Sequence, residues 1–123
     1  MEVKGIIWAG LYVEDLAKAV FFYRDAVGLK LLRQGEGWAH FAAGGRDIFE
    51  VFSGGAAHPV EKAADRQSLS IGFQVDDLAA AMTEMQGRGV VFNGEVGEWK
   101  GSRWIYFTDP EGNRLEIKEL PKK

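Results

Sequence analysis

One stretch of the sequence occurs twice, and this repeat limits the possible folds more than any other feature. Trp38–Glu50 aligns without a gap with Trp104–Glu116, at a constant offset of 66 residues (104 − 38). A second match pairs Val13–Ala19 with Val75–Ala81, at an offset of 62 residues (75 − 13). Two copies are too few for a solenoid, so the repeat predicts two similar modules that share one interior.

Each copy predicts the same element order, βαβββ. Asp15 and Asp77 precede the two helical stretches and are typical N-caps, because a carboxylate accepts hydrogen bonds from unpaired backbone N–H groups. In the first copy we expect strands over Gly5–Val13 and Leu29–Arg33, a helix that ends at Gly28, and a hairpin of 38–42 with 47–52. In the second copy we expect strands over Ser68–Val75 and from Val90 to Phe92, a helix that ends at Gly87 or Gly89, a loop over Glu95–Ser102 that contains Trp99, and a hairpin over Trp104–Lys118.

The whole chain of 123 residues is expected to form one α+β domain. Module one covers about 1–53, a linker about 54–67 and module two about 68–123. Because the same pattern occurs twice, we expect two modules related by pseudo-twofold symmetry. They would form a curved mixed sheet around a concave cleft, with the helices on its convex face.

Composition excludes several classes of function. The net charge is −3 without a basic cluster, which argues against nucleic acid and favours a neutral or cationic small ligand. No apolar run approaches the ~20 residues of a membrane span, and no export signal is recognised, so we expect a cytoplasmic protein without a membrane partner. The absence of cysteine excludes disulfides and thiolate zinc sites.

Four motifs together resemble the vicinal oxygen chelate superfamily, which includes glyoxalase I, bleomycin resistance proteins and extradiol dioxygenases. They are Tyr12–Leu16, Phe22–Leu29, Phe73–Leu78 and Phe107–Glu116, and they cover nearly the whole chain. The resemblance implies the two-module fold, and it implies a homodimer because members of this length commonly dimerise. Function does not follow from the fold alone, since this fold supports many chemistries.

The resemblance also implies where a metal ion would bind. Superfamily enzymes place two ligands per module on the concave face, one on the first strand and one on the last. Glu50 and Glu116 match the last-strand positions, but the first-strand positions are Trp8 and Ser70, where the superfamily carries histidine. The indole N–H is only a donor and a serine hydroxyl is a poor ligand, so we expect neither a metal nor another cofactor.

Strand alternation predicts which side chains face the cleft. On the last strand, Arg114 and Lys118 share the face of Glu116, which is also typical of a solvated strand. Three tryptophans at cleft-facing positions favour a flat or apolar ligand, because aromatic walls bind by area and stacking. The predicted ligand-binding residues are Trp8, Tyr12, Trp38, His40, Glu50, Phe52, Ser70, Gln74, Trp104, Tyr106 and Glu116.

The sequence therefore predicts a glyoxalase-like or bleomycin-resistance-like protein that sequesters a small aromatic or amphipathic molecule. We expect binding rather than catalysis and assign no catalytic residue. One alternative is a metal-dependent lyase, isomerase or dioxygenase that uses Glu50, Glu116 and His40 as ligands. Another is an enzyme without metal, in which His40 or a carboxylate moves protons.

Overall fold

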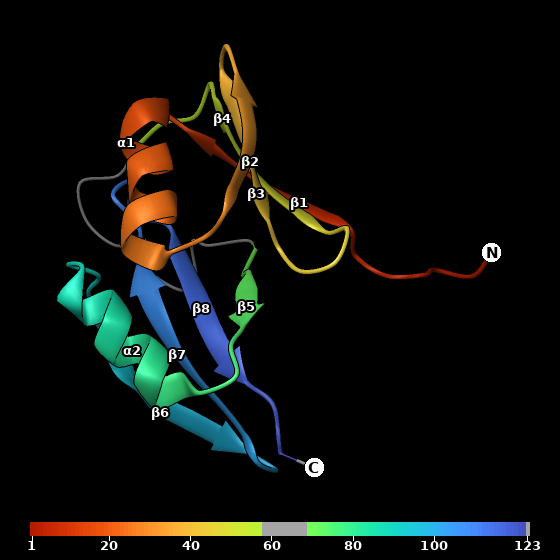
Figure 1. Cartoon of the computed structure of the whole chain (residues 1–123), viewed down its shortest axis with the longest axis vertical. Helices are drawn as coiled ribbons and strands as arrows, with labels where there is room; N and C mark the ends of the chain where they lie inside the picture. The colour runs from red at the N-terminus through yellow and green to blue at the C-terminus, as the bar shows by residue number, and fades with distance from the viewer. Residues whose placement is uncertain (58–68, 123) are drawn as a thin grey trace. The chain divides into compact units, whose positions relative to one another are not determined.

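The computed structural model describes residues 1–57 and 69–122, and it contains one four-stranded sheet in each of two units (Figure 1). Unit one covers Met1–Ala57 and unit two covers His58–Lys123. Residues 58–67 of the predicted linker lie outside the described residues. No described helix is both long and apolar enough to cross a membrane.

Unit one has the strand order β1-β4-β3-β2. Strand β1 pairs in parallel with β4, and the other two pairs are antiparallel. The helix between β1 and β2 begins as α-helix and continues as a π-helical segment, η1. The elements are β1 (Trp8–Val13), α1 (Leu16–Phe21), η1 (Phe22–Val27), β2 (Leu31–Gly35), β3 (Trp38–Ala42) and β4 (Ile48–Ser53).

Unit two repeats this arrangement with the order β5-β8-β7-β6, in which β5 pairs in parallel with β8. Its elements are β5 (Gly72–Gln74), α2 (Leu78–Gly87), β6 (Phe92–Trp99), β7 (Ser102–Thr108) and β8 (Arg114–Glu119). The predicted α+β class with two βαβββ modules is therefore confirmed, while a cleft common to the two modules stays a prediction.

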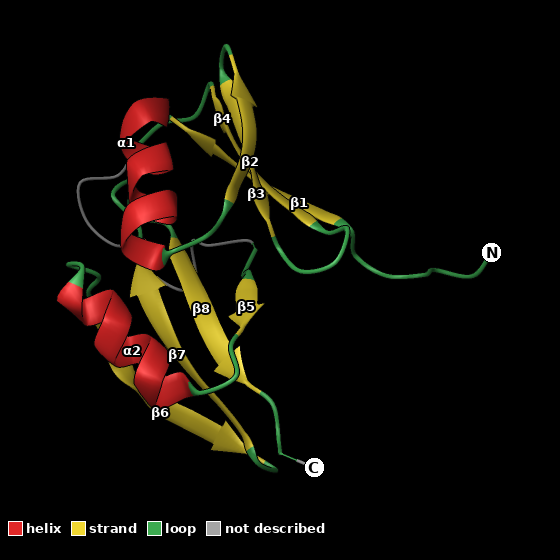
Figure 2. Cartoon of the chain, in the orientation of Figure 1, coloured by secondary structure: helices red, strands yellow, loops and turns green. Residues whose placement is uncertain are grey.

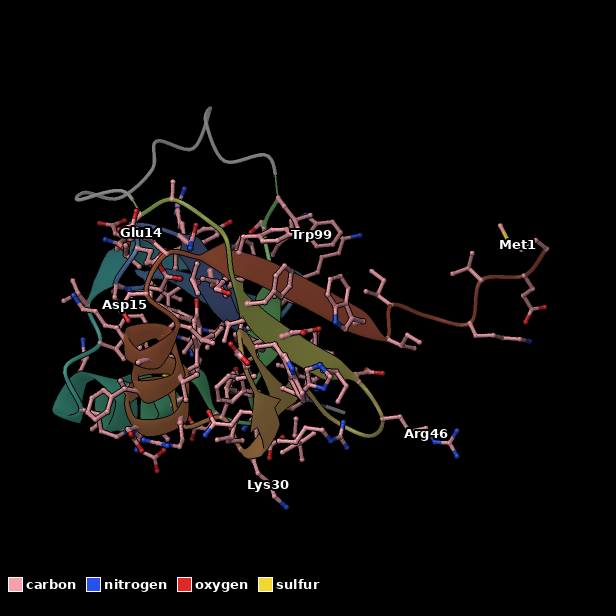
Figure 3. All side chains as sticks on the ribbon, turned by 90° about the horizontal axis from the view of Figure 1, so that it is seen from above. Met1, Glu14, Asp15, Lys30, Arg46 and Trp99 are labelled. Carbon is pink, nitrogen blue, oxygen red and sulfur yellow. The ribbon has the colours of Figure 1, made fainter. Side chains whose placement is uncertain are left out.

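Local sequence explains where the helices begin and end. Asp15 Oδ1 accepts from Lys18 N at 3.0 Å, and Asp77 Oδ1 accepts from Ala80 N at 3.0 Å, as expected of N-caps. Figure 3 shows Asp15 at the start of α1. Gly28 follows η1 with φ 94°, a left-handed conformation that glycine adopts without a steric penalty.

Each helix covers one face of its own sheet (Figure 2). The hydrophobic core of each unit lies between that helix and that sheet. In unit one, Tyr23 of η1 packs edge-on against Phe49 with ring centroids 5.0 Å apart, and both side chains are buried. In unit two, the residues that α2 and the sheet bury are Leu78, Met85, Ile105, Phe107, Leu115 and Ile117. The opposite face of each sheet therefore carries the side chains that alternate with these core residues.

Several predicted strand boundaries are wrong, including those of β2, which covers Leu31–Gly35 rather than Leu29–Arg33. Strand β1 begins at Trp8, so residues 5–7 precede it, and β5 begins at Gly72, which leaves Ser70 outside the strand. The predicted loop over Glu95–Ser102 is instead part of the β6–β7 hairpin, with β6 continuing to Trp99. Glycines in this segment suggested a loop, but the strand accommodates them through an irregularity between Asn93 and Gly97.

Candidate functional site

The strand register gathers most of the predicted site residues on the helix-free face of each sheet. In unit one, β1 places Gly10 beside Glu50, and β3 places His40 on the other side of Glu50. We call this set face one, and it consists of Trp8, Tyr12, Trp38, His40, Glu50 and Phe52. In unit two the corresponding set, face two, consists of Gln74, Trp104, Tyr106, Arg114, Glu116 and Lys118.

The carboxylate of Glu50 is the polar centre of face one. Trp8 Nε1 donates a hydrogen bond to Glu50 Oε1 at 2.8 Å, and His40 Nε2 lies 3.2 Å from the same oxygen. The side chain of Glu50 is 19% exposed and that of His40 is 23% exposed. The indole N–H of Trp8 therefore uses a lone pair of Glu50 Oε1 that would otherwise be available to a metal ion.

Arg33 of β2 contacts the other side of the His40 ring. Its Nη1 atom lies 3.4 Å from His40 Nδ1, and a guanidinium group can only donate. The imidazole of His40 therefore lies between the carboxylate of Glu50, at Nε2, and the guanidinium of Arg33, at Nδ1.

Aromatic rings surround Glu50. Trp8 and Phe52 stack with ring centroids 6.2 Å apart and an interplanar angle of 21°, and Tyr12 meets Phe52 edge-on at 4.1 Å. Gly10 makes this packing possible, because an ideal Cβ there would lie 2.6 Å from the Trp8 ring. Trp8 remains 50% exposed and Tyr12 66% exposed, so face one presents a large aromatic surface.

Face two has the same register but a different charge. Glu116 lies beside Gly72 on β5 and Tyr106 on β7. Its neighbours along β8 are cations that cover aromatic rings, with the Arg114 guanidinium 3.8 Å from the Tyr106 centroid and Lys118 Nζ 5.1 Å from the Trp104 centroid. On face two, the chain's own cations therefore occupy two of the aromatic surfaces.

Each unit also seats one tryptophan on a glycine of the neighbouring strand. Gly35 pairs with Trp38, and an ideal Cβ on Gly35 would lie 2.5 Å from Trp38 Nε1. Gly97 pairs with Trp104, and an ideal Cβ on Gly97 would lie 2.4 Å from Trp104 Cε2. Both indoles lie flat on the sheet only because these two positions lack a side chain.

Two residues, Ser70 and Arg33, lie differently from what strand alternation predicted. Ser70 is exposed and precedes β5, because the pairing of β5 with β8 begins where Ile71 O accepts from Glu116 N. Arg33 is missing from the predicted set although it contacts His40. Regular alternation back from Trp38 reaches Gly35 and then Arg33, but the strand predicted over Leu29–Arg33 did not include this hairpin.

The side chains of neither unit fit a metal centre by themselves. Among residues 1–57 and 69–122, no group of three or more histidine, aspartate or glutamate side chains is placed to hold an ion. In unit one, Glu50 and His40 offer two ligands, and the third neighbour is the indole donor of Trp8. In unit two, Glu116 has Gly72 and Tyr106 as its cross-strand neighbours.

Comparison with known proteins identifies the family. The chain is 27% identical to the metallothiol transferase FosB of Lysinibacillus sphaericus, over 95% of this chain and 83% of that protein. Its structure is similar to lactoylglutathione lyase from Agrobacterium tumefaciens (TM-score 0.72, 26% identity, 96% and 95% of the two chains covered). It is also similar to TnmS3, an antibiotic-binding protein from Streptomyces sp. CB03234 (TM-score 0.69, 26% identity, 98% of each chain covered). Residues 5–117 match the glyoxalase/bleomycin resistance protein/dioxygenase superfamily, and the chain belongs to that superfamily.

Proposed function

We propose that this protein binds a small aromatic or amphipathic molecule on face one and sequesters it without a resident metal ion. The observation that carries the proposal is the hydrogen bond from Trp8 Nε1 to Glu50 Oε1 at 2.8 Å. Trp8 stands at the first-strand position where the resemblance to the superfamily implies a metal ligand. Its indole offers an aromatic surface instead, and the carboxylate of Glu50 holds that indole in place. The similarity to an antibiotic-binding protein supports the same class of function.

Binding of a neutral amphipathic probe tests this proposal. N-phenyl-1-naphthylamine becomes fluorescent in apolar surroundings, and we expect saturable binding that weakens at least about tenfold in Trp8→Ala, because stacking and burial of an aromatic surface are lost. Phe21→Ala is the matched control, since Phe21 is 62% exposed on α1, the helix that covers the other face of the sheet. Equal binding by both variants and the unmodified protein would exclude face one as the site.

A metal-dependent lyase, isomerase or dioxygenase is the alternative, and the names of two relatives support it. Metal analysis of protein purified without chelator separates the two functions. We expect substoichiometric nickel, zinc, manganese and iron. One equivalent of any of these per chain, retained through gel filtration, would refute metal-free sequestration.

The membership of this superfamily also supports a homodimer. Sedimentation velocity at micromolar concentration tests it, and we expect a single species with twice the mass of the chain. A monomer at all concentrations would contradict the homodimer but not the binding function.

A further inference from the structure

We propose that Glu50 binds a cationic group of the ligand, so that face one selects planar aromatic molecules that carry a protonated amine or amidine. This inference rests on the proposed function and adds the charge of the ligand to it. It follows from the surroundings of one carboxylate and from a comparison with the equivalent positions of unit two.

Glu50 is a largely covered carboxylate that has no lysine or arginine partner among the described residues of unit one. Its side chain is 19% exposed, and covering a charged group is unfavourable unless it is paired or hydrogen-bonded. Both contacts to the protein go to Oε1, from the indole N–H of Trp8 and from His40 Nε2. No described residue donates to Oε2, so this oxygen can accept a hydrogen bond from a ligand.

Arg33 does not pair with Glu50 directly. Its guanidinium lies beyond the imidazole, against His40 Nδ1 rather than against Glu50. Arg33 is exposed, so water and salt screen its charge, whereas the carboxylate of Glu50 is mostly covered. The strongest interaction still available to Glu50 is a charge-assisted hydrogen bond from a ligand to Oε2.

The rings beside Glu50 place a planar ligand so that it can make this bond. Trp8 holds its indole N–H on Oε1, and its ring stacks with Phe52 while remaining half exposed. An aromatic ligand that stacks on Trp8 therefore has its edge near the same carboxylate. A cation at that edge also gains from the electron-rich ring face of the indole.

Unit two carries two cations at positions whose equivalents in unit one are apolar. The offset of 66 residues (104 − 38) places Lys118 at the position of Phe52, and Arg114 at the position of Ile48. In unit two both cations cover aromatic rings beside Glu116. In unit one these positions are apolar, so at these positions unit one leaves room for a cation of the ligand beside Glu50.

Three naphthalene probes of similar shape test the inference by isothermal titration calorimetry. They are 2-(aminomethyl)naphthalene, which is cationic at neutral pH, the neutral 2-(hydroxymethyl)naphthalene and the anionic 2-naphthoate. We expect the amine to bind about tenfold or more tightly than the alcohol, as one charge-assisted hydrogen bond provides. In Glu50→Gln, which keeps an oxygen acceptor for Trp8 and His40, this preference for the amine over the alcohol should disappear.

Glu84→Gln is the matched control, because it removes an exposed carboxylate of α2, which lies outside the predicted ligand-binding residues. It should retain the preference for the amine. Equal affinities for amine and alcohol in the unmodified protein would overturn the inference while the proposed function stands, and so would tightest binding of 2-naphthoate. If no probe binds, the proposed function and the inference both fail. The selectivity of the unmodified protein keeps the test decisive even if Glu50→Gln does not fold.

Discussion

The two units have the same strand register but different chemistry on the helix-free face. In both, a glutamate of the last strand lies between a glycine of the parallel neighbour and a ring-bearing residue of the antiparallel neighbour. Around Glu50 the flanking positions are apolar, whereas around Glu116 they are Arg114 and Lys118. The two units therefore share one backbone arrangement and differ in the charge of this face. The comparison separates the residues that form the strand pairs from those that give each face its chemistry.

The largest expected effect tests whether the two cores are equivalent. Phe41 and Phe107 occupy matching positions, on β3 and β7, and both are fully buried. Phe41→Ala and Phe107→Ala should each lower the free energy of unfolding by about 3–5 kcal/mol, since each removes a buried ring and leaves a cavity. Urea denaturation followed by circular dichroism measures this. A cost below about 1 kcal/mol in only one variant would break the equivalence of the two cores.

A smaller effect tests the tryptophans that lie on glycines. Gly35→Ala and Gly97→Ala should each cost about 1–3 kcal/mol, because the new Cβ would overlap the indole of Trp38 or Trp104. Gly87→Ala is the control, since nothing lies within 4 Å of its ideal Cβ and it sits at the end of α2. We expect that control to be neutral or slightly stabilising. Overlap would be refuted if all three variants had the same thermal midpoint.

The smallest expected effect distinguishes the two helix starts. Asp15→Ala should cost about 1 kcal/mol, because Lys18 N loses its acceptor. Asp77→Ala should cost less, since Leu78 N at the start of α2 also donates to Glu119 Oε1 at 2.9 Å. Chemical denaturation of both variants measures the difference. A larger loss for Asp77→Ala would show that Glu119 does not stabilise the start of α2.

The repeat made most of the fold predictable. Because one strand register was used twice, the alignment of Trp38–Glu50 with Trp104–Glu116 correctly predicted which residues lie beside the two glutamates. Alternation grouped Trp8 with Gly10 and Tyr12, and the resemblance to the superfamily placed this group around Glu50, where the indole donates to the carboxylate. The first step depends only on the period of a strand, whereas the second needs knowledge of which strands pair.

The predictions failed mainly at strand ends. Arg33 was missed because the predicted strand ended there, whereas β2 continues to Gly35 and forms a hairpin with β3 that pairs Arg33 with His40. Ser70 was assigned to a strand that begins two residues later, because strand ends depend on the neighbouring strand as well as on local sequence. The stacking of Arg114 on Tyr106 was not predicted either, since alternation gives the face of a side chain but not its rotamer.

The seating of Trp38 on Gly35 and of Trp104 on Gly97 has a consequence for how this protein can change. At each place a tryptophan on one strand fits only against a glycine on the neighbouring strand. A relative with a larger residue at the glycine position should therefore also lack the tryptophan, whereas in a relative without the tryptophan the glycine position is free to vary. We expect such paired substitutions, at Gly35 with Trp38 or at Gly97 with Trp104, in relatives that no longer present this aromatic surface.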